Sequence, residues 1–278
     1  MIKILNKILP ALLILNLGSA NYSAQNSNEY FPGYLNVQPF TANILEPDLG
    51  FIFKLKNDEL RLNISNSRDI VQWKRSDIIY SLGADLFTYT LLRREKEFHF
   101  PVDAVDYLFG LNFGIKKNLG SREIGARIRL SHISAHFVDG HFDSEKNEWR
   151  DGRKPRVYSR EFIELMPFIK INNLRTYAGL TYVFHIDPGN LGKWNFQFGG
   201  EYYFNKILNV FPFAAYDFRL TKINKYSGNN SVKAGIKIGK RYGRGFSIFY
   251  SFYSGKSIHG EYFDLNTKFS AIGFNLDL

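Results

Sequence analysis

The segment LSHISAHFVDG, from Leu130 to Gly140, places His132, Ser134 and His136 at every second position. Alternate residues of an extended chain point to the same side, so these three side chains would share one face of a strand. On such a face a histidine could take the proton of a neighbouring serine and so activate it as a nucleophile. The trio could equally be a polar group at the end of a strand. The kind of strand that carries it therefore matters.

The N-terminus has the layout of a secretory signal peptide. Lys3 and Lys7 precede the apolar run 8–17, and the small residues Gly18, Ser19 and Ala20 follow it. The run is too short for a membrane-spanning helix, which disfavours the alternative of a retained anchor. We expect cleavage after Ala20, with Ala24 as a second choice, and therefore export through the inner membrane.

Composition narrows the class of this exported protein. The chain has no cysteine, which excludes a lipoprotein, a disulfide scaffold and a thiolate metal site. Aromatic residues make up 17% of the chain, and no later run approaches the ~18 apolar residues of a spanning helix. The net charge of +10 would suit nucleic acid, but export makes that partner unsuitable. These features together favour a β-barrel of an outer membrane.

Period-two alternation runs along most of the chain. In SVKAGIKIGK, the apolar residues Val232, Ala234 and Ile236 alternate with Lys233 and Lys237. Recurring charges between apolar residues suit a wall with lipid on one side and a polar lumen on the other. The pattern predicts twelve strands, with ten or fourteen as alternatives, near residues 49–55, 59–65, 76–92, 102–117, 121–138, 158–171, 174–186, 193–205, 210–221, 229–239, 245–255 and 265–278.

These strands divide the chain into three parts. They are a signal peptide at 1–20, a segment at 21–45 that is a periplasmic arm or is tucked into the lumen, and a barrel at 46–278. Short and long connections fall on opposite sides, as periplasmic turns and external loops should. The exception is NSRDIVQWKR, 66–75, which is long for a periplasmic turn. The alternation also places Arg127, Arg129, Glu164, Lys170, Glu201, Asp217, Arg219, Lys233 and Lys237 in the lumen, where they could pair and plug the barrel.

Four segments resemble an uncharacterised family of outer-membrane proteins known only as a domain of unknown function. They are VDYLFGLNFGIK (105–116), ARIRLSHISAHFVDGHF (126–142), RVYSREFIELMP (156–167) and YSFYSGKSIHGEYF (250–263), in the same order and spacing. The resemblance implies a barrel in the outer membrane of a Gram-negative-type bacterium. Gly273, Leu276 and Leu278 also resemble the terminal signal that barrel-assembly machinery recognises, although that signal usually ends in an aromatic residue.

The trio itself resembles the His-x-Ser of outer membrane phospholipase A and lipid A deacylase, which lies on a lipid-facing strand. The resemblance implies Ser134 as nucleophile, His132 as base and calcium as a conceivable cofactor. The third member would lie about twelve residues after the serine, where this chain has Lys146. Asp143 or Glu145 is the nearby candidate. Ala135 also departs from the asparagine that those families place after the serine.

Two other interpretations of the trio need no catalysis. The rings could reach lipid headgroups as a polar rim. A metal site formed by His132, His136, Asp139 and His141 is disfavoured because positions i and i+4 of a strand lie ~13 Å apart. Since the third partner is missing, the sequence favours a structural or interaction protein without catalysis, metal or cofactor, in contact with outer-membrane lipids and lipopolysaccharide. A serine-dependent lipid acyl hydrolase is the alternative, and a narrow channel or transport barrel is the third.

Overall fold

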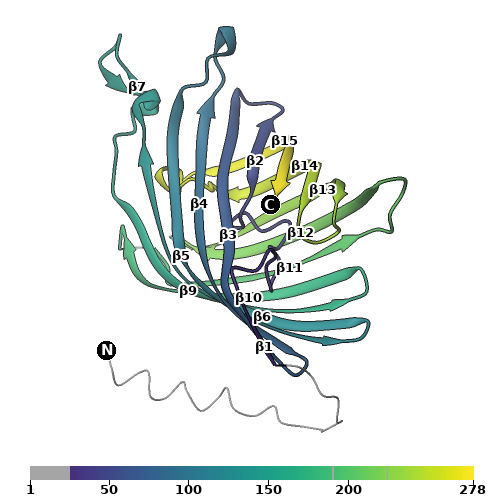
Figure 1. Ribbon diagram of the computed structural model, residues 1–278. Coiled ribbons are helices and arrows are strands. Elements are labelled where there is room, and N and C mark those ends of the chain that lie inside the picture. Colours follow the sequence, from purple (N-terminus) through teal and green to yellow (C-terminus); the bar gives the residue numbers. More distant parts are fainter. Residues whose placement is uncertain (1–25, 190, 224) are drawn as a thin grey trace.

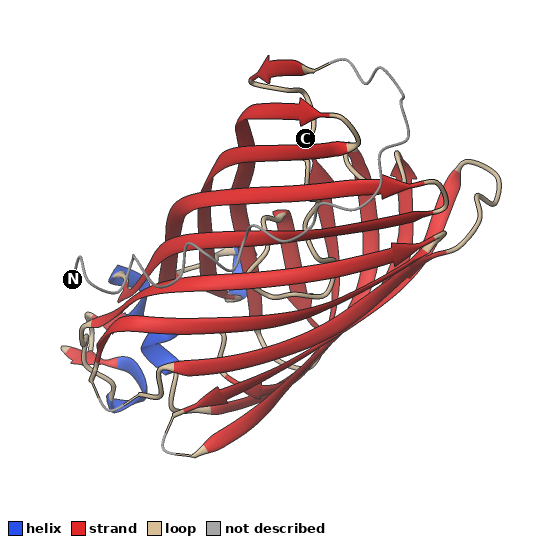
Figure 2. Cartoon of the chain, turned by 90° about the horizontal axis from the view of Figure 1, so that it is seen from below, coloured by secondary structure: helices blue, strands red, loops and turns tan. Residues whose placement is uncertain are grey.

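The computed structural model describes residues 26–189, 191–223 and 225–278. The expected signal peptide at 1–20 lies outside them. Twelve antiparallel strands form one closed sheet, in which β3 and β4 complete the circle (Figures 1 and 2). They are β2 (Leu49–Lys54), β3 (Glu59–Arg75), β4 (Ile78–Arg93), β5 (Val102–Leu119), β6 (Arg122–Phe137), β9 (Tyr158–Ile171), β10 (Leu174–Asp187), β11 (Trp194–Tyr203), β12 (Val210–Lys222), β13 (Tyr226–Gly239), β14 (Gly245–Lys256) and β15 (Asn266–Asp277). The predicted fold class and strand number are confirmed.

Short additional elements lie in the connections. A small hairpin of β7 (Phe142–Asp143) and β8 (Glu148–Trp149) projects beyond the end of β6 (Figure 1). One-turn 3₁₀ helices are η2 (Lys96–Phe98), η3 (Asp139–His141), η4 (Arg150–Gly152) and η5 (Gly260–Tyr262). Within the described ranges, no helix has the length and apolar character needed to cross a membrane.

The expected long turn at 66–75 is wrong. Those residues are the second half of β3, and only Ser76 and Asp77 connect it to β4. The register shifts between Asp69 and Val71, which breaks the period-two pattern that made the first half recognisable. At the opposite end of the barrel, β13 begins at Tyr226 rather than at 229. The connections at the end that carries Ser76 and Asp77 are all short, so we call it the short-turn end, and we call the end that carries the β6–β9 connection the long-loop end.

The first strand of the wall is built from two pieces. β2 pairs with the first half of β3, and β1 (Ser27–Tyr30) pairs with the second half, from Val71 to Lys74. Between them the chain leaves the wall and runs through the barrel, where Asn36, Phe40 and Glu46 are buried. Residues 31–48 therefore fill the lumen; we call them the inner segment.

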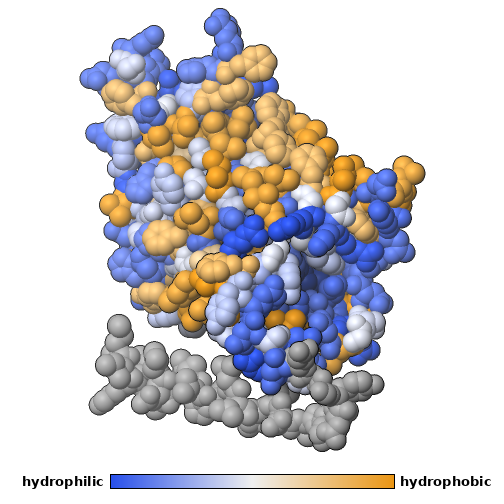
Figure 3. Space-filling model, in the orientation of Figure 1, coloured by the Kyte–Doolittle hydropathy of each residue, from blue (hydrophilic) through white to orange (hydrophobic). Residues whose placement is uncertain are grey.

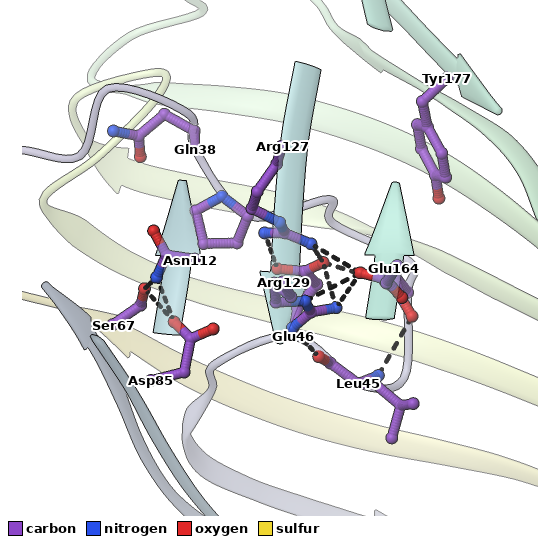
Figure 4. A network of polar contacts seen from close by, with 12 residues as sticks. Gln38, Leu45, Glu46, Ser67, Asp85, Asn112, Arg127, Arg129, Glu164 and Tyr177 are labelled. Carbon is purple, nitrogen blue, oxygen red and sulfur yellow. Dashed lines mark hydrogen bonds and ion pairs between the residues drawn. The ribbon is translucent and has the colours of Figure 1, made fainter. Parts of the chain in front are cut away.

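Buried ion pairs hold the inner segment in place (Figure 4). Arg127 Nη1 donates to Glu46 Oε2 at 2.8 Å, and Arg129 Nη1 donates to the backbone oxygen of Leu45 at 2.9 Å. Arg129 Nε also donates to Glu164 Oε1 at 2.8 Å. Charged groups without partners would be costly in this interior, so the inner segment supplies the acceptors that the wall arginines need.

Further pairs of this kind occupy the rest of the lumen. Lys233 contacts Asp48 at 3.2 Å, and Arg175 contacts Glu201 at 2.6 Å. The Phe40 ring lies under the guanidinium groups of Arg127 and Arg175, 5.0 and 4.6 Å from ring centre to Cζ. Side chains and the inner segment thus occupy the middle of the interior, and cavities of about 540 and 560 Å³ remain at its short-turn and long-loop ends.

The outer wall is apolar over a broad band. Exposed Leu, Ile, Phe and Tyr side chains cover strands around the barrel, whereas blue, hydrophilic residues gather at the ends (Figure 3). This separation is the arrangement expected of a barrel wall in contact with hydrocarbon. The polar side chains that interrupt the band therefore need an explanation.

Candidate functional site

The predicted trio lies on the outer wall. On β6 the odd-numbered residues from Arg127 to Ala135 are buried, whereas His132 and Ser134 are half-buried and His136 is exposed. The period-two pattern therefore oriented β6 correctly. Ser134 lies three residues before the end of β6, at the long-loop end.

Glu161 on β9 is the partner of His132. The two residues are directly opposite in the β6–β9 register, and Nδ1 of the ring lies 2.5 Å from Oε1 of the carboxylate. On its other side, the His132 ring packs against Phe109 of β5, with ring centres 4.9 Å apart. A ring held between a carboxylate and an aromatic face has a fixed orientation, as a general base requires.

Ser134 follows His132 on the same face and is opposite Ser159 of β9. Because Nδ1 of His132 is occupied by Glu161, Nε2 is the nitrogen left to accept a proton from Ser134. No hydrogen bond joins Ser134 Oγ to the ring in this part of the structure, and such bonds often tighten only with substrate bound. Ser159 Oγ donates to Glu161 Oε1 at 3.3 Å, which adds a second donor to the carboxylate.

A second histidine binds the other oxygen of Glu161. His185 of β10 is opposite Glu161, and its Nδ1 contacts Oε2. Regular alternation from buried Val183 would turn His185 into the lumen. The register instead shifts between Val183 and His185, so that Phe184 and His185 both face outward. β-Bulges commonly redirect a side chain in this way near functional sites.

The acids proposed from sequence lie elsewhere. Asp143 belongs to the β7–β8 hairpin, where it accepts from the Lys146 amide at 3.2 Å and faces Arg150 at 3.6 Å. Glu145 is an exposed residue of the same hairpin. The structure therefore brings Glu161, rather than either loop acid, to His132. The only sequence signal was an acidic residue at an outward position of YSREFIELM, where an apolar one is expected.

The residues of the disfavoured metal site are not brought together. His141 is buried and stacks on Phe137 at 4.0 Å, whereas His132 and His136 face outward. Among the residues that the structure describes, no group of three or more His, Asp or Glu side chains could hold a metal ion.

The β14–β15 connection supports the site from inside the barrel. Asp106 of β5 accepts from His259 Nδ1 at 2.7 Å and from the Gly260 amide at 2.6 Å. Gly260 packs so closely on Tyr158 and Ala135 that an added Cβ would lie 2.4 Å from the tyrosine ring. Burial lowers the pKa of His259 despite the facing carboxylate of Asp106, which keeps the ring neutral. The inner connection thus backs the wall directly behind Ser134 and Ser159.

A cavity of about 490 Å³ opens beside Ser134. β9 begins at Tyr158, opposite Ala135, so His136 and Phe137 at the end of β6 have no partner on that side. Residues 155–157 of the preceding connection line the cavity together with Ser134 and Ser159. A substrate group could occupy this space while contacting the serine.

The fold resembles a known barrel. Outer membrane phospholipase A from Escherichia coli superposes with a TM-score of 0.52 at 13% identity, covering 84% of this chain and 92% of that one. An active-site Asn-to-Ala mutant of that enzyme gives a TM-score of 0.53 at 14% identity, covering 87% and 92%. At this identity the likeness shows the fold alone.

The sequence comparisons give a family without an assigned activity. No curated protein matches the chain. The model of a family described as a protein of unknown function (DUF1207) matches residues 104–277, which contain β6, β9, β10 and the connection that backs them. The chain therefore belongs to the DUF1207 family, whose function is unassigned.

Proposed function

We propose that this protein is a serine-dependent lipid acyl hydrolase of the outer membrane. Ser134 is the nucleophile, His132 is the general base, and Glu161 orients the ring and stabilises its protonated form. The single observation that carries the proposal is the 2.5 Å contact between His132 Nδ1 and Glu161 Oε1, with Ser134 next on the same outward face. These are the three roles that serine hydrolases require.

The chemistry follows from the arrangement. His132 Nε2 takes the proton of Ser134 as Oγ attacks the ester carbonyl of a lipid, and the imidazolium is stabilised by Glu161. The same proton then passes to the leaving alcohol, which leaves an acyl-serine. Water, activated in turn by His132, attacks the acyl-serine and releases the fatty acid.

The position of the site suits a lipid ester. A carboxylate on a lipid-facing wall is costly except near the interface, and Glu161 lies at the long-loop end of the barrel. With the short-turn end in the periplasm, the long-loop end is external and the serine lies at the level of outer-leaflet lipids. Phospholipids and lipopolysaccharide are then the available esters. Export through the signal peptide and insertion by barrel-assembly machinery belong to the same proposal.

Two observations weigh on the alternatives. The filled lumen, with Glu46, Glu164 and Glu201 each paired to an arginine, argues against a channel or transport barrel. Glu161 contacts both His132 and His185. A polar rim that only met lipid headgroups would not need a carboxylate that fixes the orientation of these rings. Among the described residues no group of His, Asp or Glu side chains is arranged to hold a metal ion, so calcium enters only as a variable of the assay.

The test is labelling of folded protein in detergent by a fluorophosphonate probe, with and without calcium. Wild type should label, Ser134→Ala should lose all labelling, and Ser144→Ala, at an exposed serine between β7 and β8, should keep it. Absence of labelling in both conditions would refute the proposal. In that case the structural or interaction role expected from the sequence would stand.

A further inference from the structure

The cavity beside Ser134 has one fixed cation in its wall. Arg156 Nη2 donates to the backbone oxygen of Glu261 at 2.6 Å and to Asp264 Oδ1 at 2.8 Å. The guanidinium also lies over the Phe263 ring, 4.3 Å from its centre. Because two acceptors and an aromatic face hold the group, its orientation is set before any ligand binds.

This anchoring leaves donors free. Arginine carries five N–H donors, and the two contacts of Arg156 both use Nη2. Among the described residues, no hydrogen bond is made by Nε or Nη1; Glu261 Oε2 lies 3.9 Å from Nε, which is an ion-pair distance and too long for a hydrogen bond. The side chain is 36% exposed and lines the cavity. Two guanidinium nitrogens are thus available to a ligand.

Two other polar groups, His136 and Glu261, line the same cavity as Arg156. His136 lines the same cavity, and its side chain is exposed. The one carboxylate in the lining, Glu261, is 1% exposed, and its Oε1 accepts from the Phe137 amide at 3.3 Å. Asp264 and Glu261 balance the charge of Arg156, so what the guanidinium offers the open space is its N–H donors at Nε and Nη1, with the His136 ring beside them.

We infer that this cavity binds the phosphate group of the substrate lipid, with Arg156 as its main ligand and His136 as a second donor. The inference rests on the proposed function, since it places an ester at Ser134 and a phosphate above it. Arginine binds phosphate oxygens through charge-assisted hydrogen bonds whose planar geometry adds specificity. The acyl chains then lie along the apolar outer wall below the serine.

The experiment compares three esters on folded protein in mixed micelles: p-nitrophenyl butyrate, diacylglycerol and phosphatidylglycerol. Wild type should have a kcat/KM for phosphatidylglycerol about 10- to 100-fold above that for diacylglycerol, as expected of charge-assisted hydrogen bonds. Arg156→Gln should lose that preference and keep hydrolysis of p-nitrophenyl butyrate. Arg156→Lys should show an intermediate preference for phosphatidylglycerol, because lysine keeps the positive charge but lacks the planar guanidinium and its paired N–H donors.

Arg153 provides the matched control. It pairs with the same Asp264 at 3.1 Å but does not line the cavity, so Arg153→Gln should keep the preference. Glycerol 3-phosphate should inhibit butyrate hydrolysis by wild type and not by Arg156→Gln. Lipid A, compared with its dephosphorylated form, shows whether the phosphate comes from lipid A or from a glycerophospholipid.

The outcomes separate the two proposals. If wild type hydrolyses p-nitrophenyl butyrate and Arg156→Gln retains the full phosphate preference, the phosphate site is refuted and the hydrolase stands. Equal rates of wild type on phosphatidylglycerol and diacylglycerol would refute it as well. If no ester is hydrolysed, the hydrolase proposal fails and the phosphate site fails with it.

Discussion

Glu161 on β9 holds two histidines from the neighbouring strands, His132 through Oε1 and His185 through Oε2. All three side chains are on the outer wall, where the surrounding residues are mostly apolar. A carboxylate so placed requires donors on both oxygens, and each neighbouring strand supplies one. The arrangement explains both the polar interruption of the apolar wall and the bulge in β10.

Glu161→Gln should lower kcat by about 10²–10⁴-fold with little change in KM, because the ring loses its orienting partner and the imidazolium its stabilising charge. Hydrolysis of p-nitrophenyl butyrate measures this directly. Glu145→Gln is the matched control in the β7–β8 hairpin and should leave the rate unchanged. An equal loss in both variants would contradict the role of Glu161.

His185→Ala should lower kcat by about 3- to 10-fold, since one hydrogen bond to Glu161 contributes about 1 kcal/mol. His185→Gln should recover part of the rate, because its amide can donate to Oε2. Deletion of Phe184 removes the bulge but leaves His185 directly after inward-facing Val183, so the ring stays outward and opposite Glu161 and the rate should be kept. Full activity in His185→Ala would show that His185 has no positioning role.

Glu46→Ala should destabilise the barrel by about 3–5 kcal/mol, because the buried guanidinium of Arg127 loses its hydrogen-bonded carboxylate and keeps only Glu164, 3.6 Å away. Urea unfolding in detergent, followed by tryptophan fluorescence, measures the free energy of unfolding. Glu145→Ala on the exposed hairpin should change it by less than about 0.5 kcal/mol. A similar small change in Glu46→Ala would mean that the inner segment is held by other contacts.

Gly260→Ala should both destabilise the protein and reduce hydrolysis. The added methyl group would lie 2.4 Å from the Tyr158 ring and 2.6 Å from Ala135 Cβ, and overpacking of this kind costs about 1–3 kcal/mol. Gly189→Ala, whose added Cβ would have its nearest neighbour at 3.9 Å, is the control. Indistinguishable unfolding midpoints for the two variants would count against close packing behind the site.

Acid should weaken the attachment of the β14–β15 connection. Burial lowers the pKa of His259 in the folded protein, so the unfolded chain binds a proton more readily. The stability contributed by the neutral ring is then present above about pH 6.5 and is lost as the pH falls below it. Unfolding free energies of wild type and His259→Asn between about pH 4.5 and 8 test this. The two curves should converge at low pH, and a constant difference would contradict the prediction.

The sequence determined most of the barrel by itself. Alternation of side chains is a local property of an extended backbone, so it gave the number of strands and placed His132 and Ser134 on the outer face. It failed where the local period is interrupted. The register shift after Asp69 concealed the second half of β3, and the inner segment at 31–48 has no period because it is not part of the wall.

Only the tertiary structure decided the composition of the site. Glu161 lies 27 residues after Ser134, across a connection that holds a hairpin and two 3₁₀ turns. Which residue of β9 lies opposite His132 depends on the strand register, and that is fixed by closure of the whole barrel and not by spacing along the chain. The bulge that turns His185 outward is likewise a consequence of pairing. The sequence placed Ser134 and His132 on one face, and the strand register brought Glu161 to the His132 ring.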